Sequence, residues 1–177
     1  MMNYRFLVLV VFALIPFISS GQERKEVNDP EITFSYILPE GWQVKDDGYT
    51  HKIYPAEAKD AYISITYVES AKGTDYLQSL GKSSFKEDFE FELNYVLAEE
   101  YSNFKVVEQG TTLIDEAQTR WARFQSEDNG KDRISIFYMF QKHNQTFKVT
   151  GTAPAEHFEK LQLHFMSITK SIMTAKN

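Results

Sequence analysis

One stretch of this sequence decides the fold: residues 132–142 read DRISIFYMFQK. Alternate residues from Ile134 to Tyr138 would point to one face of a strand, and Phe137 and Met139 would point to the other. Both faces are therefore apolar, and a strand of that kind must be covered on both sides. The stretch predicts a sheet with helices packed on opposite faces.

The segments on either side of this stretch are predicted to pair with it in hairpins. Asp128-Asn129-Gly130 precedes it, and Asn-Gly tolerates the positive φ of a tight turn. A second tight turn is expected near His143-Asn144. The strands expected in this half of the chain are Phe104 to Thr112, Thr119 to Ser126, Asp132 to Lys142 and Gln145 to Thr152.

The first half of the chain also has strand periodicity. Ile32 to Leu38 alternates apolar and other residues, and Pro39-Glu40-Gly41 ends it, because Pro cannot donate to a sheet ladder and Gly permits a sharp turn. Trp42 follows this turn and is expected to close one end of the core. Further strands are expected at Trp42 to Val44, Tyr49 to Tyr54 and Ala61 to Glu69.

Two segments have helical periodicity. Residues 154–174 carry one apolar stripe with steps of three and four. Residues 84–101 carry a second stripe, and Ser84-x-x-Glu87 is a capping-box pattern at its start. The predicted class is α+β: a mainly antiparallel six- to seven-stranded sheet with helices on both faces, in the order βββ-α-ββββ-α. The residues of the two stripes are Phe158, Leu161, Phe165, Ile168 and Ile172, and Phe85, Phe89, Leu93 and Val96.

Two stretches resemble the PsbP-like fold family, whose members include exported bacterial proteins such as DcrB, the photosystem extrinsic subunit PsbP and a small Ran-binding protein. The opening FSYILPEGW of residues 34–42 resembles the family's first strand and its proline–glycine–tryptophan turn. The closing FKVTGTAP of residues 147–154, with the helix after it, resembles its last strand and final helix. The resemblance implies an adaptor or accessory role and not an enzyme.

The first residues indicate where the protein goes. Arg5 gives a positive start, an apolar run follows to Ile18, and Ser19-Ser20-Gly21 offers small residues for cleavage. We therefore expect residues 1–21 to be a cleaved signal peptide, with export to a periplasm or the extracellular space and no membrane insertion afterwards. Residues 22–31 are polar and are expected to form a flexible tail, and residues 32–174 a single domain.

Composition excludes several classes of function. The chain has no cysteine, which removes disulfides, thiolate nucleophiles and zinc–thiolate sites. Its net charge of −6 comes without a basic block, so a nucleic-acid partner is not expected. His157 and His164 lie seven residues apart on the last helix, too far to share one ion. We expect no metal site, no catalytic residues and no cofactor.

Two aromatic residues stand out on the first helix. Phe91 and Tyr95 are four residues apart and project away from its apolar stripe, which is typical of a contact surface. The alternative is that a short turn at residues 75–80, with Leu77 and Leu80, covers them.

The sequence favours a non-enzymatic, exported binding or accessory module whose partner is an unknown protein or a small apolar ligand. A second hypothesis is a carrier of a small molecule or lipid, with an apolar cavity lined by Tyr62, Tyr67 or Tyr138. A third is a hydrolase with a dispersed site, which would need a deep cleft where Ser, His and carboxylate groups converge.

Overall fold

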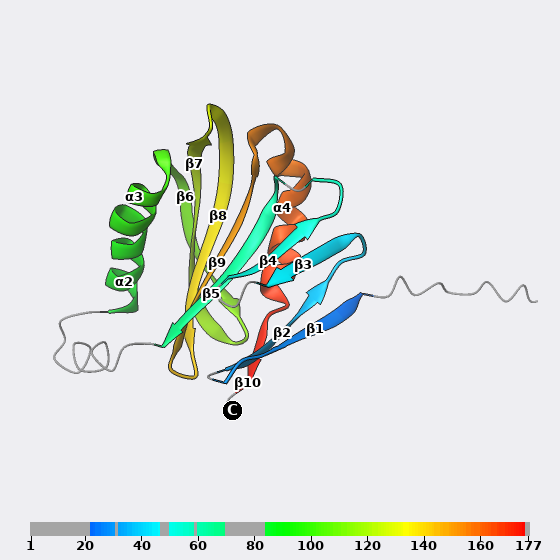
Figure 1. Ribbon diagram of the computed structural model, residues 1–177. Coiled ribbons are helices and arrows are strands. Elements are labelled where there is room, and N and C mark those ends of the chain that lie inside the picture. The colour runs from blue at the N-terminus through cyan, green and yellow to red at the C-terminus, as the bar shows by residue number, and fades with distance from the viewer. Residues whose placement is uncertain (1–21, 31, 47–49, 59, 70–83, 176–177) are drawn as a thin grey trace, which may run out of the picture.

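In the computed structural model of this protein, the residues that are described form two sheets and two helical segments (Figure 1). The expected signal peptide and the turn at residues 75–80 both lie outside the part of the chain that is described. The structure describes residues 22–30, 32–46, 50–58, 60–69 and 84–175.

The larger sheet confirms the predicted antiparallel architecture. It has seven strands in the order β3-β4-β5-β9-β8-β7-β6, and every neighbouring pair is antiparallel. Tight turns with positive φ at Asn129 and Gly130, and at His143 and Asn144, join its longest strands as expected. The strands are β3 (Trp42–Asp46), β4 (His51–Pro55), β5 (Tyr62–Glu69), β6 (Ser102–Ile114), β7 (Ala117–Asp128), β8 (Lys131–Lys142) and β9 (Gln145–Pro154).

A second sheet of three strands was not predicted. Its order is β1-β2-β10, formed by β1 (Glu23–Asn28), β2 (Thr33–Leu38) and β10 (Met173–Ala175). The prediction of a flexible tail over residues 22–31 is wrong, because β1 pairs with β2 from Glu23 to Asn28. The order βββ-α-ββββ-α is incomplete for the same reason. Five strands precede the first helix, and a short strand follows the last one.

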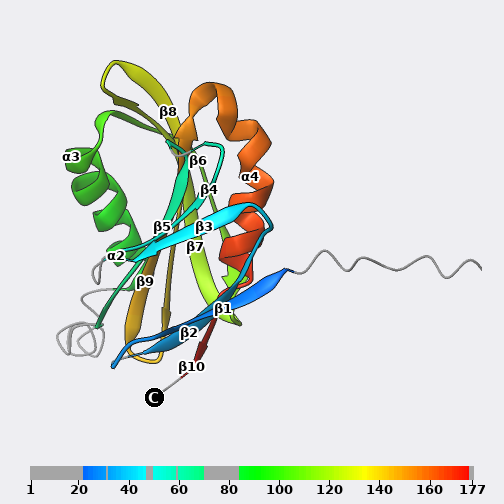
Figure 2. The same cartoon turned by 45° about the vertical axis from the view of Figure 1, so that its right-hand side comes forward.

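The two helical segments lie on opposite faces of the larger sheet, as predicted (Figure 2). The first runs from Phe85 to Glu100 and consists of α2 (Phe85–Phe91), the π-helix η1 (Glu92–Leu97) and α3 (Ala98–Glu100). We call it the first helix. Ser84 and Glu87 form the expected capping box at its start. The second is α4 (Ala155–Lys170).

Strand β8 separates two cores. Ile136 and Phe140 point to the α4 side, where they join a cluster with Phe165. Phe137 and Met139 point to the other side and join the cluster under the first helix. Both faces of β8 from Ile136 to Phe140 are thus buried, which confirms the prediction that this strand is covered on both sides.

The π-helical turn changes which residues of the first helix are buried. Leu97 is 4% exposed, whereas Val96, which was expected on the apolar stripe, is 38% exposed. A π-helix bonds residue i to residue i+5, so a turn takes more than 3.6 residues and the buried position moves from i+3 to i+4 after Leu93. The prediction for Val96 is wrong for this reason.

Candidate functional site

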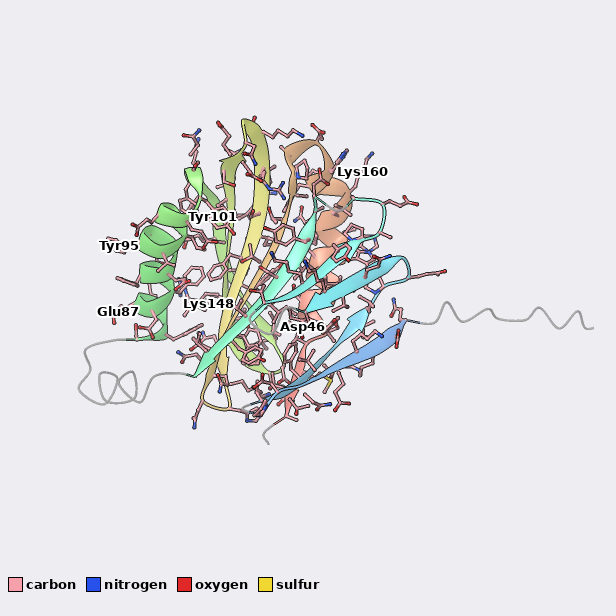
Figure 3. The ribbon with its side chains drawn as sticks, in the orientation of Figure 1. Asp46, Glu87, Tyr95, Tyr101, Lys148 and Lys160 are labelled. Atoms are coloured by element: carbon pink, nitrogen blue, oxygen red, sulfur yellow. The ribbon has the colours of Figure 1, made fainter. Side chains whose placement is uncertain are left out.

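The outward side of the first helix carries the aromatic pair that the sequence singled out. Phe91 is 59% exposed and Tyr95 is 66% exposed. Their rings are stacked, with centroids 5.2 Å apart and planes inclined by 30°. Tyr95 lies on the side of the helix turned away from the sheet (Figure 3). The two rings therefore form one exposed apolar patch, which we call the aromatic pair.

The inward side of the same turn holds a charged pair. The Glu92 carboxylate lies 2.7 Å from the Lys148 ammonium, which reaches up from β9. Glu92 is 8% exposed although it stands next to Leu93 in an apolar part of the helix. A buried carboxylate needs a partner, and Lys148 provides it. The ion pair ties η1 to the sheet.

A polar groove opens beside this ion pair, between the first helix and strands β4, β5 and β9. We call it the η1 groove, and its volume is about 360 Å³. Tyr62 and Tyr101 line it, and the Lys52 ammonium lies over the Tyr62 ring, 5.2 Å from its centroid. Burial raises the pKa of both tyrosines, so their hydroxyls stay protonated at neutral pH. The hydroxyl-bearing residues along the groove are Thr50, Ser64, Thr66 and Thr150.

A second cleft lies on the opposite face, between α4 and strands β6, β7 and β8. We call it the α4 cleft, and its volume is about 310 Å³. Trp121 and Tyr138 line it from the sheet, and Gln162 and Met166 line it from the helix. Apolar side chains with a few polar groups at the rim are typical of small-molecule sites.

The three tyrosines named as alternatives for the lining of a cavity lie in three different places. Tyr62 and Tyr67 are five residues apart on β5, so they point to opposite faces of the sheet. Tyr62 lines the η1 groove and Tyr138 lines the α4 cleft. Tyr67 packs in the α4-side core against Phe34 and Phe147. Tyr62 and Tyr138 therefore each line a hollow between the sheet and a helix, on opposite faces, whereas Tyr67 belongs to the core.

A set of Ser, His and carboxylate groups does not converge in either cleft, as far as the described residues go. No histidine lines the η1 groove or the α4 cleft among the residues described. Three or more His, Cys, Asp or Glu side chains suited to hold a metal ion do not come together anywhere in the described ranges. The same part of the chain contains no helix with the length and apolarity to span a bilayer.

One histidine does sit in a hydrogen-bonded chain, inside the core. The Tyr36 hydroxyl lies 2.7 Å from His51 Nε2, and His51 Nδ1 lies 3.2 Å from the Asp46 carboxylate. The Asp46 carboxylate can only accept, so the hydrogen of the neutral imidazole lies on Nδ1, and Nε2 accepts from the Tyr36 hydroxyl, which stays protonated because burial raises the pKa of Tyr36. Tyr36 is fully buried, which makes this chain a way to satisfy core polar groups and gives no access to a substrate.

Solved structures with the same architecture identify the fold. The chain matches cyanobacterial PsbP (CyanoP) from Synechocystis with a TM-score of 0.59 and 10% identity, over 88% of this chain and 94% of that one. The chain has a PsbP-like fold. The resemblance seen in the sequence is thereby confirmed, although no protein-family model and no curated protein matches the sequence itself.

Two further structures share the PsbP-like fold. LpqN, described as involved in cell envelope biogenesis of Mycobacterium tuberculosis, matches with a TM-score of 0.56 and 12% identity, over 86% of this chain and 91% of that one. A protein from Bacteroides thetaiotaomicron matches with a TM-score of 0.54 and 12% identity, over 81% of this chain and 46% of that one.

The sequence reasoning missed the η1 groove, although two signals were present. Glu92 stands beside Leu93 at a position that faces the sheet, which indicates a buried carboxylate in need of a cation. Ser64, Thr66, Lys148 and Thr150 occupy alternate positions of two strands, which indicates that one half of the sheet has a polar face.

Proposed function

We propose that this protein is an exported accessory module that binds a partner protein through the outward face of its first helix and carries out no reaction of its own. The observation that supports the proposal most strongly is the aromatic pair. Two large rings stacked side by side leave a contiguous apolar area exposed to water, and such an area on a helix surface marks a contact site.

The pair can supply a large part of a binding energy. At their exposed fractions, Phe91 and Tyr95 would together bury roughly 250 Å² of apolar surface, worth about 6 kcal/mol as an upper limit. Stacking already restrains both side chains, so little rotamer entropy is left to lose on binding. Aromatic residues of this kind are enriched at the energetic centre of protein interfaces.

The charges around the pair indicate the chemistry of the partner. Lys86 is the one basic residue of the first helix, against six acidic residues in the same segment. Glu87, Glu99 and Glu100 are exposed. We expect a partner surface with an apolar pocket and a basic rim, because complementary charge at the rim speeds association and selects the partner.

Two observations support export. Residues 1–21 have the charge, apolar run and small residues of a secretory signal. LpqN, which shares the fold, is described as involved in cell envelope biogenesis. Sequencing the amino terminus of protein purified from its host checks this directly, and a mature chain that begins at Gln22 is the expected result.

The test of the partner surface is the double substitution F91S/Y95S. The tagged protein is recovered from its own host with its bound proteins, the partner is identified by mass spectrometry, and its Kd is measured with purified components. We expect the double substitution to raise that Kd tenfold or more while the melting temperature stays close to that of the wild type.

A matched control is L113S/L163S, which removes two exposed leucines elsewhere on the surface. Leu113 is 65% exposed and Leu163 is 74% exposed, so the apolar area lost is similar. The control should bind the partner normally. An equal loss of binding in both double variants would contradict the proposal. A large fall in melting temperature for F91S/Y95S would show that the rings are covered and act as core.

A further inference from the structure

We infer that the α4 cleft is a binding site for a small aromatic carboxylate. The inference goes beyond the proposed function, because this cleft lies on the opposite face of the sheet from the aromatic pair. It rests on three features of the cleft: an unpaired hydroxyl, a flat aromatic floor and the distribution of charge along its rim.

The unpaired hydroxyl belongs to Tyr138. This side chain is 2% exposed and lines the cleft. Within the described part of the chain, its hydroxyl makes no hydrogen bond. Burial raises the pKa of Tyr138 to about 12, so the hydroxyl keeps its proton and remains a donor. The hydroxyl borders the cleft, so an acceptor brought by a ligand would take its hydrogen bond in place of water.

The indole of Trp121 lines the cleft from the sheet, and it packs against a glycine of the neighbouring strand. Trp121 and Gly110 are paired across β6 and β7, and a Cβ atom at Gly110 would lie 2.8 Å from the indole ring. The ring therefore rests directly on the backbone of β6, where only glycine leaves room. Trp121 is only partly buried and lines the cleft, so a planar ring could stack on the part of the indole that borders the cleft.

The charges of the rim are unequal. The Arg123 guanidinium lies 3.5 Å from the Glu108 carboxylate and 3.8 Å from the Glu159 carboxylate, so its charge is already offset, and one carboxylate remains in excess at that end of the rim. Lys170, the last residue of α4, also lines the cleft. Its ammonium has no ion-pair partner among the residues described. An anionic group on the ligand would pair with Lys170 and could accept the hydrogen bond from Tyr138.

The volume agrees with a compact ligand. About 310 Å³ is near the lower end of the range for small-molecule sites, which suits one fused ring system with a carboxylate. Met166 and Gln162 from α4 form the opposite wall, and a thioether adapts well to an aromatic edge.

The experiment uses naphthoate as the probe and the two tryptophans as reporters. The chain has two tryptophans, so an isotope-labelled sample gives two indole N–H signals by NMR, which W42F assigns. We expect naphthoate to shift the Trp121 signal and leave the Trp42 signal in place, with a Kd below about 1 mM for a ligand of this size.

Three comparisons test the assignment of the groups. Y138F should raise the Kd about tenfold by removing one charge-assisted hydrogen bond, whereas Y62F, which changes a tyrosine on the other face, should leave it unchanged. The neutral analogue naphthamide should bind more weakly than naphthoate. Q162W should fill the cleft and abolish the shift.

An unchanged Kd in Y138F, equal binding of naphthamide, or equal shifts of both indole signals would each overturn the inference. The test is separate from that of the partner surface, because F91S/Y95S should bind naphthoate like the wild type. If Q162W does not fold, Y138F still decides the outcome, since removal of a hydroxyl without a partner leaves the packing intact.

Discussion

The packing of α4 against the sheet depends on a glycine, and replacing it by alanine should destabilise the protein. Gly151 of β9 faces α4, and a Cβ atom there would lie 2.8 Å from Cγ and 3.0 Å from Cβ of Phe165. Carbon atoms in contact prefer about 3.5–4.0 Å. Either the helix moves away from the sheet or the Phe165 ring rotates.

Neither movement is free, because Phe165 is fully buried among other rings. Its ring centroid lies 6.1 Å from that of Trp42 and 6.0 Å from that of Phe158. Overpacking of this kind costs about 1–3 kcal/mol. Alanine also restricts the unfolded chain, which offsets about 0.5–1 kcal/mol. We expect G151A to lower the free energy of unfolding by about 1–2 kcal/mol.

The assay is urea unfolding followed by tryptophan fluorescence, with the m-value as a check that the unfolding transition is unchanged. F165A should cost less in the G151A background than in the wild type, with a coupling of at least about 0.5 kcal/mol, because it removes Cγ and the ring, which are the atoms that a Cβ at position 151 approaches most closely. A G151A protein as stable as the wild type, or additive effects of the two substitutions, would refute the close contact between β9 and α4.

Three further predictions concern single contacts. W42A should cost about 3 kcal/mol or more in urea, because Trp42 is 9% exposed and its loss leaves a cavity; a cost below about 0.5 kcal/mol would place it on the surface. E92A should cost about 1–3 kcal/mol by leaving Lys148 without its partner, and a double change of both residues to leucine should cost less than E92A. Burial alone would raise the pKa of Asp115. Hydrogen bonds from Thr174 and the ammonium of Lys142 outweigh the effect of burial, so the pKa of Asp115 lies below its ordinary value. The stability that the ionised carboxylate contributes is present above the unfolded-state pKa and is lost as pH falls through the lowered folded-state value, so D115N should be less stable than the wild type at pH 7, and the difference should shrink as the pH falls through the acid range.

The larger sheet could be predicted because its strands bury residues in a simple pattern. Ile63 and Ile65 alternate with polar neighbours, and β8 is apolar on both faces, so burial follows from period two alone. Strand β1 has no such pattern. Its exposed and half-buried residues form a strand because β2 offers a free edge, and that is information which only the tertiary structure holds.

The candidate surfaces were predictable only in part. The exposure of Phe91 and Tyr95 agrees with their phase on the helix, because residues four apart lie on one side of either helix type. The partner of the buried Glu92 carboxylate is Lys148, which lies 56 residues further along the chain. The pairing of Trp121 with Gly110 likewise depends on register across two strands, and a local pattern does not contain it.

The small sheet has a consequence for the order in which the chain is completed. Strand β2 pairs on one side with β1 and on the other with β10. Ser35 therefore cannot pair with Met173 until the end of the chain has been synthesised. During synthesis at about 5–20 residues per second, the first strands are available roughly 10–30 s before their last partner exists. Until β10 has been synthesised, one edge of β2 has no partner strand, so the nascent chain cannot complete the small sheet.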